Sequence, residues 1–264
     1  MADWGKISRR GMVTAGVGGA AALIWNFNSL TLSPDFAHVF HAIEDWTEFG
    51  QRALLVPQRL APEYAIRDIS PTFKPNGTID PATDDYNRHV SQGFVNWRLT
   101  IDGMVQKPLS LSLADLRRLP ARTQITKHDC VEGWTAIGMW TGVQLGLLLK
   151  AAGLNPGARY AVFHCADNLD GEASKGGEQS PGQYYESVDL VDAFHPQTIL
   201  AYAMNGQNLA VPHGAPLRLR VERQLGYKQA KYVQRIEIVD SFARIAGGRG
   251  GYWEDRGYEW YAGI

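Results

Sequence analysis

Strand-like and helix-like segments follow one another irregularly along this chain, and their order constrains the fold more than any other feature. Residues 95–105 alternate apolar and polar side chains, as a half-buried strand does. Further strand patterns follow at residues 159–166, 217–223 and 232–240. They are not joined by a regular strand–helix–strand rhythm, which argues against a doubly wound sheet. The sequence therefore predicts an α+β fold, mixed and strand-rich, with short helices.

Short-range signals predict two of these helices. Ser112 and Asp115 have the spacing of a capping box, which indicates a helix that ends before Pro120. A second helix is expected in the segment 140–153, with Thr141 as its cap and Gly153 as its stop.

Two further local patterns concern strands. In the first strand pattern the residues that share one face are Val95, Trp97, Leu99 and Ile101. The pair Asn205-Gly206 stands between two apolar segments and is a strong signal for a two-residue hairpin turn.

Composition excludes several classes of protein. A chain of 264 residues that is 45% hydrophobic can bury a core of its own. With 26 basic and 27 acidic residues it has no charge excess that would favour nucleic acid or anionic lipid. Two cysteines are too few for a disulfide scaffold. The chain has no GxGxxG after a strand, no P-loop and no CxxC, which disfavours a nucleotide site, an NTPase and a thioredoxin-like or zinc-ribbon role.

The N-terminal part is expected to direct the chain out of the cytoplasm. Residues 1–30 contain Arg9 and Arg10, followed by a weakly apolar stretch, which is the pattern of a twin-arginine export signal. We expect a periplasmic protein, with an uncleaved anchor left open. Residues 31–69 are predicted to form an amphipathic helical segment and a linker, and residues 70–264 the main domain. The Pro/Gly/Asp-rich stretch 69–87 is predicted to be a long loop.

Cys130 is the most informative single residue. It follows an extended segment and precedes a Gly-Trp turn, so it lies where a strand ends and a loop begins. Residue types alone leave several roles open: a small buried hydrophobe, half of a disulfide with Cys165, a zinc ligand or a nucleophile with a histidine partner.

Three separated motifs in the same order give the chain a resemblance to a known family. Residues 128–149, 213–239 and 251–260 look like the molybdopterin-binding domain of the sulfite oxidase superfamily. The form "CVEGW" is most similar to the bacterial periplasmic branch that includes a methionine-sulfoxide reductase catalytic subunit. The resemblance implies a sulfite-oxidase-type molybdopterin-binding domain with a molybdenum–molybdopterin cofactor.

The resemblance also implies roles for single residues. Cys130 would be the protein thiolate on the molybdenum, a role that suits a soft sulfur ligand. Tyr258 would reach the metal pocket and donate a hydrogen bond there. The residues implied to bind the cofactor are Asn76, Gly77, Cys165, His213, Arg218, Gly226, Lys228 and Lys231.

Departures from the family pattern bear on the substrate. Pro75 stands where sulfite oxidases have an arginine before the matched asparagine, and "VEGW" replaces the arginines that follow their cysteine. We therefore expect oxygen-atom transfer on an S-oxide or N-oxide. The alternatives are a sulfite dehydrogenase with a non-standard anion pocket and a non-catalytic exported binding domain.

The resemblance further implies partners. Electrons would be exchanged with a separate membrane haem protein or cytochrome, because the sequence has no CxxCH haem motif. Residues 36–55 are our candidate for meeting that partner. The immunoglobulin-like dimerisation domain of sulfite oxidases has no counterpart after Tyr258, so we expect a monomer.

Overall fold

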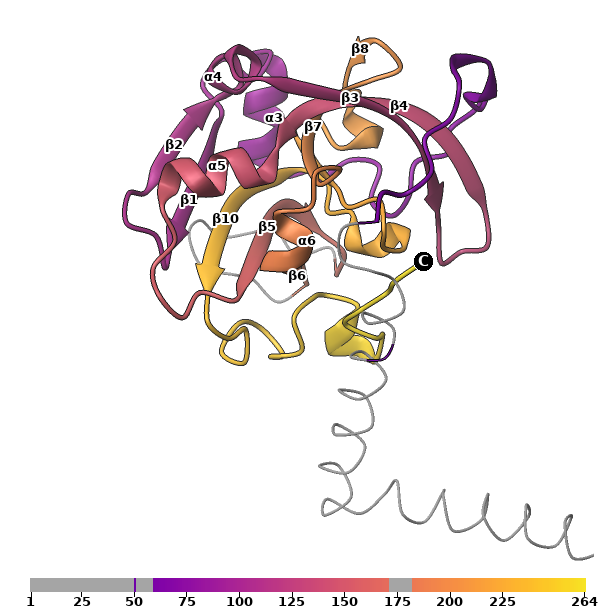
Figure 1. Cartoon of the computed structure of the whole chain (residues 1–264). Helices are drawn as coiled ribbons and strands as arrows, with labels where there is room; N and C mark the ends of the chain where they lie inside the picture. Colours follow the sequence, from indigo (N-terminus) through magenta and orange to yellow (C-terminus); the bar gives the residue numbers. More distant parts are fainter. Residues whose placement is uncertain (1–49, 51–58, 171–181) are drawn as a thin grey trace, which may run out of the picture. The chain divides into compact units, whose positions relative to one another are not determined.

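The computed structural model describes residue 50, residues 59–170 and residues 182–264 (Figure 1). The predicted export signal and most of the predicted amphipathic segment lie outside these residues. The boundary at residue 70 stays a prediction. Within the ranges described, every helix is too short or too polar to cross a bilayer.

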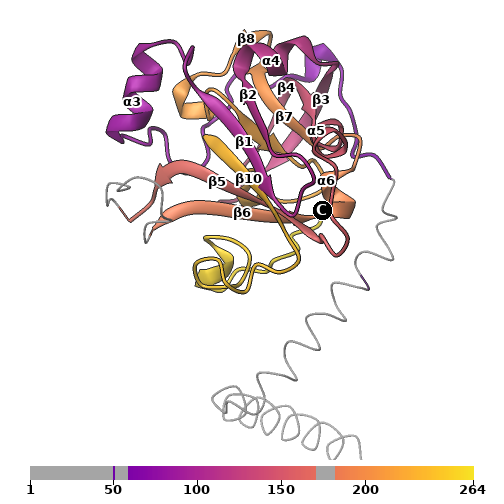
Figure 2. The same cartoon turned by 90° about the vertical axis from the view of Figure 1, so that its left-hand side faces the viewer.

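The first sheet brings together strands that are far apart in the sequence (Figure 2). Its strand order is β2–β1–β10–β5–β6. The pair β1–β10 is parallel and the other pairs are antiparallel. The strands are β1 Arg98–Gly103, β2 Leu109–Ser112, β5 Tyr160–Asn168, β6 Gln183–Asp189 and β10 Val233–Val239.

The second sheet is antiparallel and contains the long hairpin that ends at Cys130. Its order is β3–β4–β7–β8, and a further strand, β9, pairs with β7. The hairpin register runs without interruption from Ala121 opposite Val143 to Asp129 opposite Thr135. The strands are β3 Ala121–Asp129, β4 Thr135–Gln144, β7 Ile199–Met204, β8 Gln207–Asn208 and β9 Arg218–Arg220.

Short helices and 3-10 turns complete the described fold. The α-helices are α3 Asp84–Ser91, α4 Leu113–Arg118, α5 Leu145–Ala152 and α6 Leu190–Ala193. The 3-10 turns are η2 Ile66–Asp68, η3 Val211–His213, η4 Gly226–Lys228 and η5 Glu254–Arg256. One apolar core joins residues of both sheets and of α5, including Ile101, Val143, Leu149, Leu219 and Ile236. The predicted α+β fold is confirmed.

The local predictions with the clearest chemistry are confirmed. Ser112 and Asp115 form a complete capping box at the start of α4. Asn205 and Gly206 both have positive φ angles, 50° and 77°, as a two-residue turn between β7 and β8 requires. Leu145, Leu148 and Leu149 of α5 are buried, and Gly153 follows its last residue.

Three predictions about element limits are wrong. Val95 is 74% exposed, and the first strand begins only at Arg98. Thr141 lies inside β4, where its hydroxyl is 2.8 Å from that of Thr123 across the hairpin. Helix α5 therefore starts later, because pairing with β3 and β7 extends β4 to Gln144.

The predicted loop 69–87 contains the first turn of α3.

Helix α3 begins with a cap that the loop prediction overlooked. The Thr83 side chain accepts a hydrogen bond from the backbone N–H of Tyr86. Two acidic residues follow in the first turn, where they favour the helix dipole. These residues carry a helix start signal despite the Pro/Gly-rich composition around them.

The capping box of α4 makes a stability prediction. The Ser112 hydroxyl accepts from Asp115 N at 3.1 Å and donates to its carboxylate at 2.6 Å. Ser112→Ala removes both bonds, so we expect the free energy of unfolding to fall by about 1 kcal/mol. Urea denaturation followed by circular dichroism measures this. The control is Ser110→Ala, an exposed position on the same strand, which should change the value much less; equal losses would contradict the prediction.

Candidate functional site

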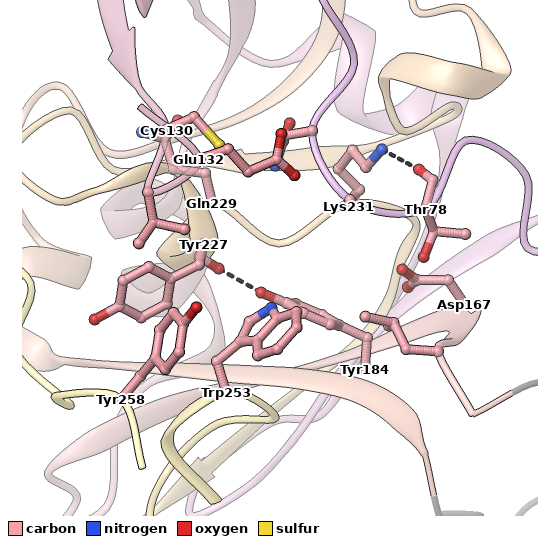
Figure 3. Close-up of a pocket in the computed structure, with 14 residues that line it drawn as sticks. Thr78, Cys130, Glu132, Asp167, Tyr184, Tyr227, Gln229, Lys231, Trp253 and Tyr258 are labelled. Carbon is pink, nitrogen blue, oxygen red and sulfur yellow. Dashed lines mark hydrogen bonds between the residues drawn. The ribbon is translucent and has the colours of Figure 1, made fainter. Parts of the chain in front are cut away.

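A pocket opens where segments from six parts of the chain meet (Figure 3). Its cavity volume is about 140 Å³, and its mouth is open to solvent. The lining residues are Asn76, Gly77, Thr78, Cys130, Val131, Glu132, Asp167, Leu169, Tyr184, Tyr227, Gln229, Lys231, Trp253 and Tyr258. Five of the ten residues singled out in the sequence therefore line one pocket: Asn76, Gly77, Cys130, Lys231 and Tyr258.

Cys130 is held by the turn of the β3–β4 hairpin. Its backbone N–H donates to Trp134 O at 2.9 Å, and its carbonyl accepts from Gly133 N at 3.0 Å. Both bonds fix the backbone, so the thiol is left to face the pocket (Figure 3). Burial raises the pKa of this thiol above its ordinary value of 9.0. Without a bound metal, Cys130 is thus a protonated thiol at neutral pH.

Cys165 has a different environment. It lies in β5, is fully buried in the apolar core, and does not line the pocket. Both cysteines are free, so the disulfide between them is excluded. Among residues 59–170 and 182–264, no three His, Cys, Asp or Glu side chains gather as a metal-binding group, which is what the zinc alternative requires.

A carboxylate stands two residues after the thiol. Glu132 Oε2 accepts from Lys74 Nζ at 3.1 Å and from Trp134 Nε1 at 3.0 Å. These two donors, the Trp134 hydrogen bond first, hold the pKa of Glu132 below its usual value. Cys130 therefore lies near an ionised carboxylate that is paired with Lys74.

The Asn76 loop is joined to the loop that follows β9. Asn76 Oδ1 accepts from Arg218 Nη2 at 3.4 Å, and Asn76 Nδ2 donates to Gly226 O at 3.4 Å. Arg218 also donates to His213 O at 3.1 Å. Both contacts of Asn76 are long for N–H···O bonds, so its amide forms only weak hydrogen bonds with the protein.

Gly226 lies against the hairpin that carries Cys130. A Cβ atom at this position would be 2.5 Å from His128 Nε2 and 3.2 Å from Asp129 O. No side chain fits there. His128 therefore occupies the space that the missing side chain of Gly226 leaves.

His128 is oriented by a buried arginine. Arg220 Nη1 lies 3.0 Å from His128 Nδ1, and the same guanidinium binds both oxygens of Glu222, at 2.9 and 2.5 Å. Because arginine only donates, Nδ1 accepts and Nε2 carries the proton. Burial, followed by the Arg220 charge, lowers the pKa of His128 well below its usual value, so the ring is neutral.

Arg218 is buried beside the same cation. The guanidinium carbons of Arg218 and Arg220 lie 4.9 and 4.4 Å from the centre of the Trp140 ring, and this ring faces both. Burial and Arg220 lower the pKa of Arg218 to about 9, so it remains charged at neutral pH. Burial also lowers the pKa of His213 to about 4, which leaves that ring neutral.

Lys228 and Lys231 have opposite environments. The Lys228 ammonium is fully buried between Glu186 and Glu254, at 2.5 and 2.6 Å, and lies away from the pocket lining. Lys231 lines the pocket, and its ammonium donates only to the carbonyls of Thr78 and Pro212. Burial, followed by Arg218, lowers the pKa of Lys231 to about 7, although the nearby Asp167 opposes this shift.

Several buried polar atoms around the pocket lack a partner among the described residues. They are Asp167 Oδ1, in the lining, and Arg218 Nε, on the guanidinium that donates to Asn76; His213 Nδ1 is also without a partner, but His213 lines a separate pocket with Phe73. Buried polar groups are normally hydrogen-bonded, so such a cluster indicates a site for a polar ligand. Burial raises the pKa of Asp167, against the opposing effect of Lys231.

The sequence analysis did not single out several lining residues. Glu132, Gln229 and Trp253 belong to the quoted motifs and could have been found there. Asp167 and Tyr184 lie on β5 and β6, where no local signal distinguishes them from core residues.

Comparison with known proteins identifies the family to which this chain belongs. Residues 87–244 match the family model described as oxidoreductase molybdopterin binding domain. A candidate protein-methionine-sulfoxide reductase subunit, YedZ1, of Azospira oryzae is 37% identical over 210 residues, which cover 80% of this chain and 70% of the relative. The protein-methionine-sulfoxide reductase catalytic subunit MsrP of Gluconobacter oxydans is 36% identical over 169 residues, or 62% of this chain and 52% of the relative.

One solved structure is also similar in part. It is the sulfane dehydrogenase SoxCD from Paracoccus pantotrophus, with a TM-score of 0.48 and 26% identity, covering 56% of this chain and 39% of that one.

The roles of Lys228 and Lys231 can be distinguished by their effects on the stability of the protein. Lys228→Met leaves Glu186 and Glu254 buried without their shared cation, so we expect the cofactor-free protein to lose about 3–5 kcal/mol of unfolding free energy. Lys231→Met removes a cation that burial disfavours, so its cost should stay below about 1 kcal/mol. Urea denaturation at neutral pH compares the two variants, and similar losses would refute the distinction.

The Cys130 thiol can be tested by its reactivity. Since the thiolate is the reactive form, alkylation of the cofactor-free protein by iodoacetamide should be slow at neutral pH and still rise above pH 9.0. Mass spectrometry of the labelled peptide gives the rate. Cys165→Ser should leave the profile unchanged, because Cys165 is fully buried. A rate that levels off below pH 9.0 would contradict the raised pKa.

Proposed function

Because the chain belongs to the family of oxidoreductase molybdopterin-binding domains, we propose that this enzyme reduces S-oxides by oxygen-atom transfer. Two relatives are named for protein-methionine-sulfoxide reductases, which makes a methionine S-oxide side chain the substrate we favour. The chain spans 70% and 52% of these relatives, so its substrate and partners are part of the proposal.

The residues of the pocket fit a molybdenum–molybdopterin cofactor. Cys130 supplies a soft sulfur ligand, and metal coordination favours its thiolate in spite of the raised pKa. Asn76, His213, Arg218 and Lys231 would hold the pterin and its phosphate. The unpartnered His213 Nδ1 and Arg218 Nε, together with the Lys231 ammonium, are groups that such a polar, anionic ligand would satisfy.

The observation that carries the proposal is the shared pocket of Cys130, Asn76 and Lys231. When bound, the cofactor supplies the two-electron redox change and accepts the oxygen atom. The chain's own residues bind, orient and supply hydrogen bonds. The Tyr258 hydroxyl, at the pocket, can donate a hydrogen bond to the oxygen of an S-oxide.

The charges of the pocket support a neutral substrate. Its lining has two acidic residues, Glu132 and Asp167, and Lys231 as its cation. Glu132 is kept ionised beside the thiol. A dianion such as sulfite would meet this carboxylate, whose charge Lys74 offsets only in part at 3.1 Å, whereas a sulfoxide carries no net charge. The reaction consumes two protons and two electrons and releases a thioether and water.

Export and electron supply complete the proposal. A twin-arginine signal within residues 1–30 would place the enzyme in the periplasm, and residues 36–55 would dock to a membrane haem protein that delivers the electrons.

Turnover with a reduced dye should survive deletion of residues 36–55, while turnover with the membrane partner should not. Gly77 and Gly226 would belong to the loops that bind the cofactor, as the resemblance implies.

The test uses protein purified from a host that makes the cofactor. We expect near-stoichiometric molybdenum by elemental analysis, reduction of methionine sulfoxide with reduced benzyl viologen, and little sulfite oxidation with cytochrome c. Cys130→Ala should lose S-oxide turnover by at least about 100-fold, because it removes the ligand to the metal. Sulfite oxidation faster than S-oxide reduction would favour the sulfite dehydrogenase instead. Folded protein without molybdenum would support the non-catalytic binding domain.

A further inference from the structure

One wall of the pocket is made of aromatic rings, of which the function proposed above uses only the Tyr258 hydroxyl. Trp253, Tyr258 and Tyr227 lie together on the side opposite Lys231 and Thr78 (Figure 3). Two aliphatic residues, Val131 and Leu169, line the same pocket. We call the three rings the aromatic wall.

The rings of the aromatic wall pack on one another. Trp253 and Tyr258 are stacked, with centroids 5.2 Å apart and planes 28° apart. Tyr227 meets Tyr258 edge to face, at 5.2 Å and 87°. Both geometries are favourable for aromatic pairs. The Tyr227 hydroxyl donates to Glu259 O at 2.6 Å, so its polar end is satisfied.

The turn that carries the wall is anchored at several points. Tyr258 N and Arg256 N both donate to Trp253 O, at 3.0 and 2.9 Å, and Gly257 adopts the positive φ of 99° that this tight turn needs. Glu254, within the turn, is buried against Lys228 at 2.6 Å. The guanidinium of Arg256 lies 3.6 Å from the Tyr252 ring centre. The wall is therefore a preformed surface.

The fold leaves part of this apolar surface uncovered. Tyr258 is 38% exposed and Val131 is 48% exposed. Val131 directly follows Cys130, so the uncovered surface begins beside the thiol. An aromatic surface that is rigid, partly exposed and open to a pocket can bind an apolar ligand group.

We propose that the aromatic wall is the subsite for the aliphatic part of the substrate, with Trp253 as a residue that determines specificity. The inference rests on the function proposed above and narrows its substrate class to S-oxides of alkyl thioethers, such as a methionine S-oxide side chain. The methylene groups next to the sulfur pack on the ring faces, and the S-oxide oxygen turns away from these faces toward the hydrogen-bond donors of the pocket, among them the Tyr258 hydroxyl. Sulfur and methyl groups both pack well against aromatic rings.

The polar half of the pocket supports this orientation. Lys231 and Thr78 lie across from the wall (Figure 3), and the amides of Asn76 and Gln229 also line the pocket. An S-oxide has one strongly polar atom and two apolar arms, so a site with one polar and one aromatic side orients it. An inorganic oxyanion or a small N-oxide has no aliphatic chain to place on the wall.

The experiment compares two substrates that share the reacting group. Holoenzyme of the native sequence, Trp253→Ala and Trp253→Phe is assayed with N-acetyl-methionine-sulfoxide methylamide and with dimethyl sulfoxide. The quantity compared is kcat/KM for N-acetyl-methionine-sulfoxide methylamide divided by kcat/KM for dimethyl sulfoxide. For Trp253→Ala we expect this ratio to fall about tenfold, which is the effect of leaving two methylene groups in water. The loss should lie in KM rather than in kcat, because contacts with the tail do not change during the reaction.

Trp253→Phe keeps an aromatic face and serves as the matched control, so its ratio should stay within about threefold of the native value. Molybdenum content and thermal unfolding establish that each variant is folded and loaded. An unchanged ratio in a loaded Trp253→Ala holoenzyme would overturn the inference and leave the proposed function intact.

A binding measurement distinguishes a failure of the aromatic subsite from a failure of the proposed function. If the native holoenzyme reduces no S-oxide, the proposed function fails, and calorimetric titration with N-acetyl-methionine-sulfoxide methylamide still tests the wall. Weaker binding to Trp253→Ala than to Trp253→Phe would support the subsite. Equal binding, or none to the native protein, would overturn it.

Discussion

The contact between Gly226 and His128 is the constraint on which the pocket depends. The glycine belongs to the loop after β9 and the histidine to the β3 strand that leads to Cys130. A Cβ atom at residue 226 would lie 2.5 Å from His128 Nε2, so any side chain would separate the two segments. Arg220 holds the ring in place from its other nitrogen, at 3.0 Å. The loop that carries Lys231 is thereby kept against the hairpin that carries the thiol.

Two buried lysines near this pocket, Lys228 and Lys231, have different roles. Lys228 is neutralised by Glu186 and Glu254, and this cluster anchors the turn of the aromatic wall. Lys231, three residues further on, has only carbonyl partners for its ammonium and is available to an anionic ligand. Its nearby counter-charge, Asp167, does not offset the cost of burying this cation, so Lys231 indicates a binding role, whereas the fully paired Lys228 indicates a structural role.

The local signals at the start of α4 and at the β7–β8 turn agreed with the structure, whereas two element limits were decided by strand pairing and differed from the prediction. The capping box of Ser112 and Asp115 acts within three residues, so its helix could be read from the sequence. Thr141 also has the chemistry of a cap, but β3 and β7 pair with its segment and make it a strand. Val95 follows the alternation of a strand, yet β1 pairs with its neighbours only from Arg98.

By itself, the sequence determined the α+β class, the place of Cys130 at a strand end and, through the order of its motifs, the resemblance to a molybdopterin-binding family. Only the tertiary structure decided which motif residues face the pocket. It buried Cys165 in the core and brought Glu132 and Trp253 into the lining. The reason is the range of the interactions: local signals act over a few residues, whereas the contact between Asn76 and Gly226 joins positions 150 residues apart.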